Sequence, residues 1–353
     1  MKVFVTGHRG YIGAHLVQLL KLEGHYVIGC DLYLYASSRR GALTEPDLDL
    51  CLDIRTISPK QLAGCDCVMH LAAISNDPMG ELDPKLTEEI NIGGTMHLAR
   101  AAKKAGVPRF LFSSSCSIYG QGTSLDLDED APLHPQSAYA HSKILAEKQL
   151  ALLATSEFSP SFLRNATAFG DSPMLRLDLV VNNLLACAMT KGEVRIQSDG
   201  TPWRPLIHAK DIARAFIAFL HAPRTLIHNL AVNIGANREN VQVHEIAKKI
   251  LSYRPDAKIV FTGEVGADPR NYRVCFDRLY RLLPDFKLAY TLDRGIEEMT
   301  HSFASPCLTR EEFEGGKFTR LTVLKRQFSE GAQSGIFRSS IVASTEIGRV
   351  PPF

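Results

Sequence analysis

The sequence lacks any uninterrupted apolar run of about 18 residues, which is the length that a helix needs to cross a bilayer. It also lacks the hydrophobic segment of a signal peptide. The apolar stretch within residues 1–7 is too short for one and has instead the pattern of a β-strand. We therefore expect no membrane-spanning segment and a cytoplasmic protein.

An excess of charge of either sign is absent as well. Lysine and arginine together number 40, aspartate and glutamate together number 38, and the formal net charge is +2. Nucleic acids and anionic membranes attract strongly basic proteins. This balance gives no electrostatic reason to expect either of them as a partner.

Clustered cysteines are also missing. The eight cysteines are scattered, and no pair has the CxxC spacing. The one close pair, Cys65 and Cys67, has no second cysteine or histidine cluster at the spacing of a zinc site. We expect no metal site, and we interpret the cysteines as reduced thiols of a cytosolic protein.

The composition that is present, 45% hydrophobic and 22% charged residues, is ordinary for a soluble globular protein. A length of 353 residues suits one large α/β unit or about two domains. Over the first 165 residues we expect strands at 3–6, 26–30, 68–73, 110–113 and 161–164, and helices at 12–22, 90–105 and 138–153. Strands separated by helices indicate a parallel sheet that is covered on both faces.

The pattern changes after about residue 171. Helical spacing at 179–189, 212–221, 244–251 and 292–303 is interrupted by a Gly- and Pro-containing segment at 199–205. We expect a Rossmann-like, doubly wound α/β domain over 1–170, a smaller mixed α/β lobe over 171–335 with some chain returning to the core, and a tail over 336–353.

Three glycines follow the first expected strand and open the first expected helix. Gly7, Gly10 and Gly13 permit a tight turn whose backbone N–H groups, together with the helix N-terminus, can hold a pyrophosphate. Asp31 ends the second expected strand, where a carboxylate can accept hydrogen bonds from both hydroxyls of a ribose. The combination predicts a dinucleotide site in the 1–170 domain; a purely structural turn is the alternative.

Arg9 lies inside this loop and bears on which dinucleotide binds. Its side chain could meet the 2′-phosphate of NADP, whereas Asp31 occupies the ribose position itself and would repel that phosphate. We therefore expect NAD and disfavour NADP. The alternative interpretation of Arg9 is a solvated loop arginine.

Tyr139 and Lys143 are four residues apart at the start of an expected helix, so their side chains share one face. An ammonium beside a phenol favours the phenolate and lowers the pKa of the tyrosine from about 10 toward working pH. Such a tyrosine can exchange a proton with a hydroxyl during hydride transfer. A YxxxK pair on its own also fits two surface residues on a helix.

A run of serines at 113–115 follows another expected strand. It should therefore lie at the carboxyl edge of the parallel sheet, where such folds bind ligands. A hydroxyl there can hydrogen-bond to a substrate oxygen, and a plain polar loop is the alternative.

These motifs, in this order, resemble the extended short-chain dehydrogenases/reductases, in particular the NAD-dependent nucleotide-sugar epimerase/dehydratase group. The resemblance covers about residues 1–300. Beyond the motifs above, it rests on Asp53-Ile54, His70-Leu71-Ala72-Ala73, Asn91-Ile92-Gly93-Gly94-Thr95, the segment 113–120, and Trp203-Arg204-Pro205-Leu206-Ile207-His208 with Asp211.

The resemblance implies a role for each matching residue. Tyr139 would be the general base, Lys143 its partner on the nicotinamide ribose, and Ser115 the catalytic serine. The implied cofactor site comprises Gly7, Arg9, Gly10, Tyr11, Ile12, Gly13, Asp31, Asp53, Ile54, Leu71, Ala72, Ala73, Asn91, Ser113, Tyr139 and Lys143. The implied site for a nucleotide-diphosphate sugar comprises Ser115, Thr167, Arg176, Arg204 and Arg270.

Two departures from the family pattern narrow the chemistry. The family's dehydratases place Asp-Glu directly after the catalytic Ser or Thr, and this chain has Cys116 and Ser117 there, which disfavours dehydration. A usual substrate-contacting Asn is replaced by Thr167, and the loop 171–176 is not of the common form. Both changes leave the identity of the sugar open.

Three functions share these residues. The first is an epimerase that oxidises a sugar hydroxyl to a ketone and returns the hydride to the other face, so that no net redox occurs. The second is a net ketoreductase or dehydrogenase for nucleotide sugars that exchanges its cofactor. The third, which the intact Tyr139 and Lys143 disfavour, is a non-catalytic dinucleotide-binding protein. The resemblance also implies a homodimer, formed through helices at 84–105 and 138–153.

Overall fold

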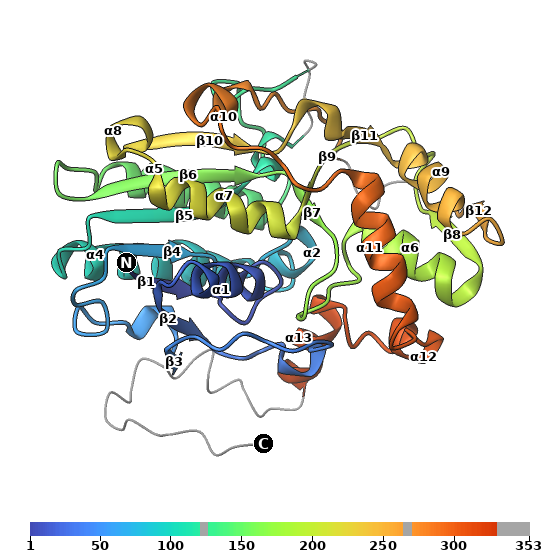
Figure 1. Cartoon of the computed structure of the whole chain (residues 1–353), viewed down its shortest axis with the longest axis horizontal. Coiled ribbons are helices and arrows are strands. Elements are labelled where there is room, and N and C mark those ends of the chain that lie inside the picture. The colour runs from blue at the N-terminus through green and yellow to red at the C-terminus, as the bar shows by residue number, and fades with distance from the viewer. Residues whose placement is uncertain (121–125, 264–269, 330–353) are drawn as a thin grey trace.

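The computed structural model describes residues 1–120, 126–263 and 270–329, so the expected tail at 336–353 lies outside the described residues. Its centre is a seven-stranded sheet in the order β10-β6-β5-β4-β1-β2-β3, in which every pairing is parallel (Figure 1). Its strands are β1 (Lys2–Thr6), β2 (Tyr26–Asp31), β3 (Leu48–Cys51), β4 (Cys67–His70), β5 (Arg109–Ser115), β6 (Ser159–Asn165) and β10 (Leu230–Ile234). The predicted Rossmann-like sheet is confirmed.

Helices cover both faces of this sheet. α1 (Gly13–Leu22) packs against α7 (Ala209–His221) on one face, and α4 (Thr95–Lys104) packs against α5 (Ala138–Ala151) on the other (Figure 1). Because side chains alternate along a strand, Val3 and Val5 of β1 join the apolar cluster with α1 and α7, whereas Phe4 joins the cluster with α4 and α5.

Two elements near the site differ from the sequence prediction. The predicted strand 68–73 stops at His70, so residues 71–73 leave the sheet. The predicted helix 90–105 contains a π-helical segment, η3 (Glu89–Gly94), before α4. The start of α5 follows its signal, because the Ser137 hydroxyl accepts a hydrogen bond from the backbone N–H of Ala140 at 3.1 Å.

The smaller lobe has two short sheets and its own core. β7 (Thr167–Phe169), β9 (Trp203–His208) and β11 (Asn240–Gln242) form one sheet, and β8 (Glu193–Ile196) and β12 (Lys258–Phe261) form the other. Around a separate apolar cluster pack α6 (Val180–Lys191), α9 (Val243–Tyr253) and α11 (Leu292–Ala304). Between β9 and β11 the chain returns to the large sheet as β10.

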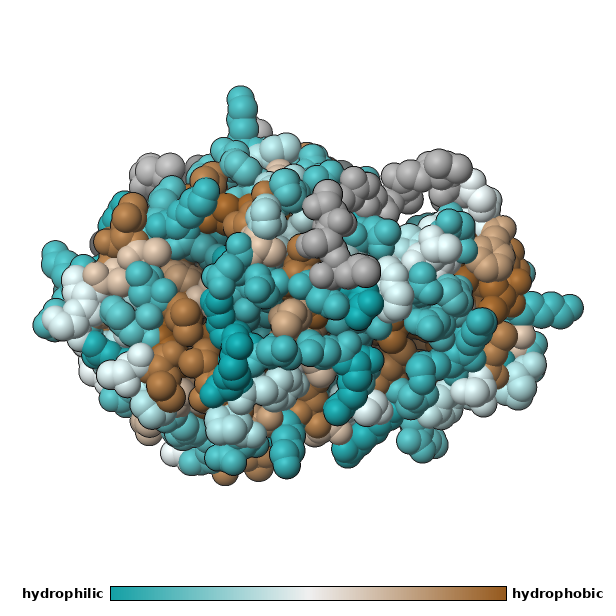
Figure 2. Space-filling model, turned by 90° about the horizontal axis from the view of Figure 1, so that it is seen from above, coloured by the Kyte–Doolittle hydropathy of each residue, from teal (hydrophilic) through white to brown (hydrophobic). Residues whose placement is uncertain are grey.

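Short helices complete the described chain. They are α2 (Asp77–Gly80), α3 (Pro84–Glu88), α8 (Arg224–Ile227), α10 (Asp277–Leu282), α12 (Arg310–Glu314) and α13 (Arg320–Ser329), with 3-10 turns η1 (Ala36–Ser38), η2 (Ile54–Thr56), η4 (Cys116–Tyr119) and η5 (Asn237–Glu239). Within the described ranges no helix is long and apolar enough to span a membrane. On the face drawn in Figure 2, hydrophilic side chains predominate and the hydrophobic ones form separate smaller patches.

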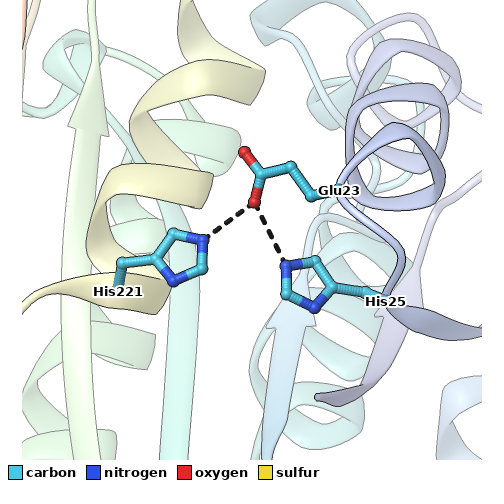
Figure 3. A group of neighbouring side chains, drawn as sticks. All are labelled: Glu23, His25 and His221. Atoms are coloured by element: carbon cyan, nitrogen blue, oxygen red, sulfur yellow. Dashed lines mark hydrogen bonds and ion pairs between the residues drawn. The ribbon is translucent and has the colours of Figure 1, made fainter.

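A polar contact ties α1 to α7 where the two helices end. Glu23 accepts from His25 at 3.2 Å and from His221 at 2.8 Å through the same carboxylate oxygen (Figure 3). The sequence gives no sign of this group, because its members come from residues almost 200 positions apart. Its side chains are of types that metal ions use, and their ligand atoms lie within 4.8 Å of one another.

Candidate active site

A single pocket at the carboxyl edge of the large sheet collects most of the predicted site residues. It is lined by Gly7, Arg9, Gly10, Tyr11, Ile12, Gly13, Asp31, Asp53, Ile54, Leu71, Ala72, Ala73, Ser113, Ser115, Tyr139, Lys143, Thr167, Arg176 and Arg270. Two of the predicted residues, Asn91 and Arg204, lie behind its lining. The carboxyl edge is where parallel α/β sheets bind their ligands.

The glycine loop leaves room for a ligand to approach the backbone. Gly7 has a φ of +70°, and a Cβ there would lie 2.8 Å from the backbone nitrogen of Ala72. A Cβ on Gly13 would overlap the carbonyl oxygen of Gly7. The turn is closed by a hydrogen bond from the Gly10 N–H to the Gly7 carbonyl at 2.9 Å. The glycines therefore let the loop pack tightly and lead directly into the N-terminus of α1, an arrangement that a pyrophosphate fits.

Asp31 is fixed at the end of β2. Its carboxylate accepts from the backbone N–H of Arg9 at 3.1 Å and from that of Tyr33 at 2.8 Å. The Arg9 guanidinium is paired with Asp49 and, at 2.7 Å, with Glu45, and it lies 4.9 Å from the centre of the Tyr33 ring. Its charge is therefore offset by two carboxylates, and this end of the pocket suits the free ribose hydroxyls of NAD better than a 2′-phosphate.

Tyr139, Lys143 and Ser115 converge in the pocket. The Ser115 side chain lies beside the Tyr139 phenol and favours its phenolate. Lys143 Nζ donates to the carbonyl oxygen of Ser113 at 2.7 Å and lies 5.6 Å from the centre of the Tyr139 ring. The lysine therefore ties the first turns of α5 to the end of β5, next to the phenol.

The pKa of Tyr139 differs from the sequence prediction. Burial, followed by the nearby Asp77 carboxylate, raises it to about 12, although Ser115 and two arginines lower it. Burial also lowers the pKa of Lys143 to about 7, against the opposing effect of Glu147. The prediction of a lowered tyrosine pKa is wrong for this protein without ligands, because it counted the lysine and ignored the desolvation of both groups.

Asn91 supports the site from the π-helical segment. Its amide accepts from the N–H of Ile74 at 2.9 Å, and donates to the carbonyl oxygen of Ile74 and to the Ser142 hydroxyl, both at 3.0 Å. Ser142 is next to Lys143 in α5. Asn91 thus links the loop after β4 to the helix that carries the Tyr–Lys pair, and π-helical turns are often found at such positions.

The three predicted substrate arginines are held differently. Arg176 pairs with Asp178 through two hydrogen bonds, of 3.0 and 2.9 Å. Arg270 contacts Asp77 at 2.6 Å across the pocket mouth. Arg204 donates to the carbonyl oxygens of Trp203 and Arg270, so in this structure it positions the backbone that presents Arg270.

Below the strand ends lies a buried ion pair. Arg164 and Glu147 are 2.8 Å apart, and each side chain is 8% exposed. Glu147 also accepts from the Ser114 hydroxyl, while Arg164 donates to the carbonyl oxygen of Glu129 at 2.9 Å. The pair therefore braces the serine-bearing end of β5 against α5.

Several residues that line the pocket were not predicted from the sequence. Asn165 and Ser117 each keep one buried oxygen without a hydrogen-bond partner, and both line the pocket. Asp77 lines it near Tyr139, and Tyr272 lines it near Asp77. Arg320 reaches it from α13. The Asn-Asp-Pro sequence at 76–78 is a helix-start signal that could have drawn attention to Asp77, whereas Arg320 has no local signal.

A family model agrees with this geometry. Residues 3–235 match the model of the NAD dependent epimerase/dehydratase family. UDP-glucose 4-epimerase from Lactobacillus helveticus is 29% identical over 294 residues, which are 76% of this chain and 87% of that protein. A putative UDP-glucose 4-epimerase from Methanocaldococcus jannaschii is 27% identical and covers 82% of this chain and 92% of its own.

Solved structures agree as well. MoeE5 in complex with UDP-glucuronic acid and NAD has a TM-score of 0.76 at 25% identity, over 87% of this chain and 100% of that one. UDP-glucose 4-epimerase from Thermotoga maritima with UDP-glucose has a TM-score of 0.76 at 24% identity, over 87% and 99%. These likenesses cover nearly all of the described residues.

Proposed function

The chain belongs to the NAD-dependent epimerase/dehydratase family, and from this premise we propose that it epimerises a nucleotide-diphosphate sugar, with Tyr139, Lys143 and Ser115 as its catalytic residues. The observation that carries the proposal is that Ser115, Tyr139 and Lys143 line the same pocket as the glycine loop and Asp31. A hydride acceptor, a proton acceptor and a sugar-binding hydroxyl are thereby brought to one place.

The residues that fit the cofactor are those of the loop and the strand ends. NAD, when bound, supplies the acceptor and the donor for the hydride of a sugar C–H bond. Backbone N–H groups where the loop enters α1 would hold its diphosphate, and Asp31 would accept from a ribose. The pairing of Arg9 with Asp49 and Glu45 removes the one feature that favoured NADP.

Tyr139 would move the proton. As the phenolate it takes the proton of the sugar hydroxyl during oxidation, and it returns the proton when the hydride comes back. Lys143, which is 5.6 Å from the ring, favours that phenolate whenever it carries its charge. Ser115 would hold the sugar oxygen near the phenol, because both side chains line the same part of the pocket.

The positions after Ser115 support epimerisation over water loss. Cys116 is 1% exposed, its thiol contacts the carbonyl oxygen of Arg164 at 3.1 Å, and burial raises its pKa well above the usual value. A neutral buried thiol and Ser117 provide neither the acid nor the base that dehydration needs.

The test uses purified protein without added cofactor. An absorbance scan should show retained NAD(H), because an epimerase regenerates its cofactor in every turnover. Incubation with UDP-glucose, the sugar nucleotide named for the relatives, and with other nucleotide-diphosphate sugars should give an epimeric product with no lasting rise at 340 nm. Product formation that requires added NAD or NADP in stoichiometric amounts would instead identify a net dehydrogenase or reductase.

We further propose a cytoplasmic homodimer that pairs through α4 and α5. All eight cysteines are free thiols, which suits a reducing compartment. α4 and α5 pack side by side on one face of the sheet, as the resemblance leads us to expect of the dimer helices. Light scattering should give about twice the chain mass of 39.0 kDa, and a monomer at all concentrations would contradict the proposal.

A further inference from the structure

Helix α13 closes one side of the pocket, although it lies more than 80 residues beyond the last residue of the family match. Two hydrogen bonds join α13 and the residues just before it to the loop after β2. The Ser38 hydroxyl donates to the carbonyl oxygen of Lys317 at 2.7 Å, and the Gln327 amide donates to that of Leu34 at 2.5 Å. Figure 1 shows α13 beside the short blue segment that follows β2. Leu324 packs in a small apolar cluster with Met79.

Arg320, the first residue of α13, lines this pocket. It is 2% exposed, and its guanidinium lies 4.2 Å from the centre of the Tyr35 ring. One terminal nitrogen donates to the carbonyl oxygen of Met174 at 3.2 Å. The other, Nη1, is buried and has no hydrogen-bond partner among the described residues. A buried guanidinium normally uses its whole fork, so an unmet N–H indicates a missing acceptor.

The surroundings of Arg320 indicate the charge of that acceptor. Burial, and next the neighbouring Arg176, lower the pKa of Arg320 to about 10, so it is still a cation at neutral pH. Asp178 is already bound by both arms of Arg176. Asp31 also faces this group, but its oxygens accept from two backbone N–H groups. An anion between the two guanidiniums would therefore be well stabilised.

The position of the pair indicates which anion. Arg320 interacts electrostatically with Asp31 at the ribose end of the pocket, and Arg176 interacts with Tyr139 at the reacting end. The pair thus lies between the two ends of a bound dinucleotide, where its diphosphate must pass. Resting on the proposed function, we infer that Arg320 binds the cofactor's pyrophosphate from the side opposite the glycine loop, and that α13 is the strap that holds it there.

The experiment separates the phosphate from the rest of the nucleotide. Calorimetric titration of full-length, cofactor-stripped protein with ADP, adenosine and NADH is compared for wild type, Arg320→Gln and Arg320→Lys. The charge-assisted bond predicts that Arg320→Gln weakens ADP and NADH binding by about 10- to 100-fold and leaves adenosine unchanged. Arg320→Lys keeps the charge but loses the planar guanidinium, so its affinities for ADP and NADH should lie between those of wild type and Arg320→Gln.

Arg326→Gln is the matched control, since Arg326 lies on the same helix but is exposed and donates to the carbonyl oxygen of Gly315 at 2.7 Å. It should change none of the three affinities. Equal loss of ADP and adenosine would overturn the inference, because it would mean that the helix had merely detached. Unchanged ADP binding with a raised KM for the nucleotide sugar would also overturn it and assign Arg320 to the substrate. A wild type that binds neither NADH nor ADP would instead refute the proposed function.

Discussion

The pocket has two walls that are built in different ways. The strand-end wall, formed by residues 7–13, Asp31, 71–73 and 113–115, consists of the last residues of strands of the large sheet and of short segments that directly follow strands. The rim, formed by residues 174–178 and α13, consists of segments brought together only by tertiary contacts, such as that between Arg320 and Met174. The functional residues of the first wall can be recognised from local sequence patterns. Those of the second wall come together only when the whole chain has folded.

The difference teaches how specificity can be divided within one site. The strand-end wall offers what every dinucleotide shares: backbone N–H groups at Gly7 to Gly13 and a carboxylate at Asp31. The rim adds two buried cations, Arg176 and Arg320. Changes at residues 7–13 and Asp31 should therefore alter the affinity for the cofactor or the choice between cofactors, and changes at Arg320 should alter how tightly the cofactor is retained.

The largest effect should come from Tyr139→Phe. The change keeps the buried ring and removes the proton-transfer oxygen, so kcat should fall by about 10²- to 10⁴-fold while cofactor affinity stays the same. Steady-state rates and NADH titration measure the two. Ser115→Ala should be milder, because the phenol remains. Near-full activity of Tyr139→Phe would show that the proposed mechanism is wrong.

Gly7→Ala should give the next largest effect. The substitution must adopt a φ of +70° and place a methyl 2.8 Å from the Ala72 nitrogen. We expect cofactor affinity to fall by more than tenfold and the free energy of unfolding to fall by about 1–3 kcal/mol. Gly24→Ala is the control, since Gly24 has a φ of +76° but open space around it. The Gly24→Ala variant should lose stability but keep its cofactor affinity. An equal loss of cofactor affinity in both variants would contradict the explanation that the contact between residue 7 and Ala72 shapes the cofactor site.

Asp31→Ala should change which dinucleotide is preferred. Loss of a charged acceptor should weaken NAD by roughly tenfold, and loss of the repulsion should strengthen NADP. Parallel titrations of the two cofactors measure the ratio. If the ratio did not move, Asp31 would only be holding the loop through its bonds to Arg9 and Tyr33.

The smallest effect concerns pH. The pKa of Lys143 is lowered to about 7, against about 10.4 in an unfolded chain, so between these values the unfolded chain binds the extra proton. The stability of cofactor-free protein should therefore gain roughly 1 kcal/mol per pH unit from this group above pH 7. Above about pH 10 the raised pKa of Tyr139 reverses the sign. Urea unfolding of wild type and Lys143→Met at several pH values tests this, and identical slopes would contradict it.

The sequence was sufficient for the strand-end wall because its signals are local. Gly7 to Gly13 after an apolar strand, Asp31 at the end of the next, and Tyr139 four residues before Lys143 need only the period of a strand or helix to be placed. The parallel sheet followed from the alternation of such patterns, and the structure confirms it. The assigned roles of these residues stay predictions.

What could not be predicted depends on burial and on distant contacts. The raised pKa of Tyr139 results from desolvation by the assembled pocket. The π-helical turn at Asn91 is stabilised by the amide's bonds to Ile74. Arg320 meets Met174 across 146 positions of the chain. No window of sequence contains these pairs, so no periodicity could predict them.

The central claim is that one bound NAD takes a hydride from the sugar and returns it to the same carbon. The most direct measurement is turnover of the true nucleotide sugar in D₂O without added cofactor, followed by mass and proton NMR spectra of the product. We expect the epimer to carry no deuterium at the inverted carbon, because the hydride never exchanges with solvent. Deuterium at that carbon would show that inversion occurs by removal of a proton, and would contradict the account.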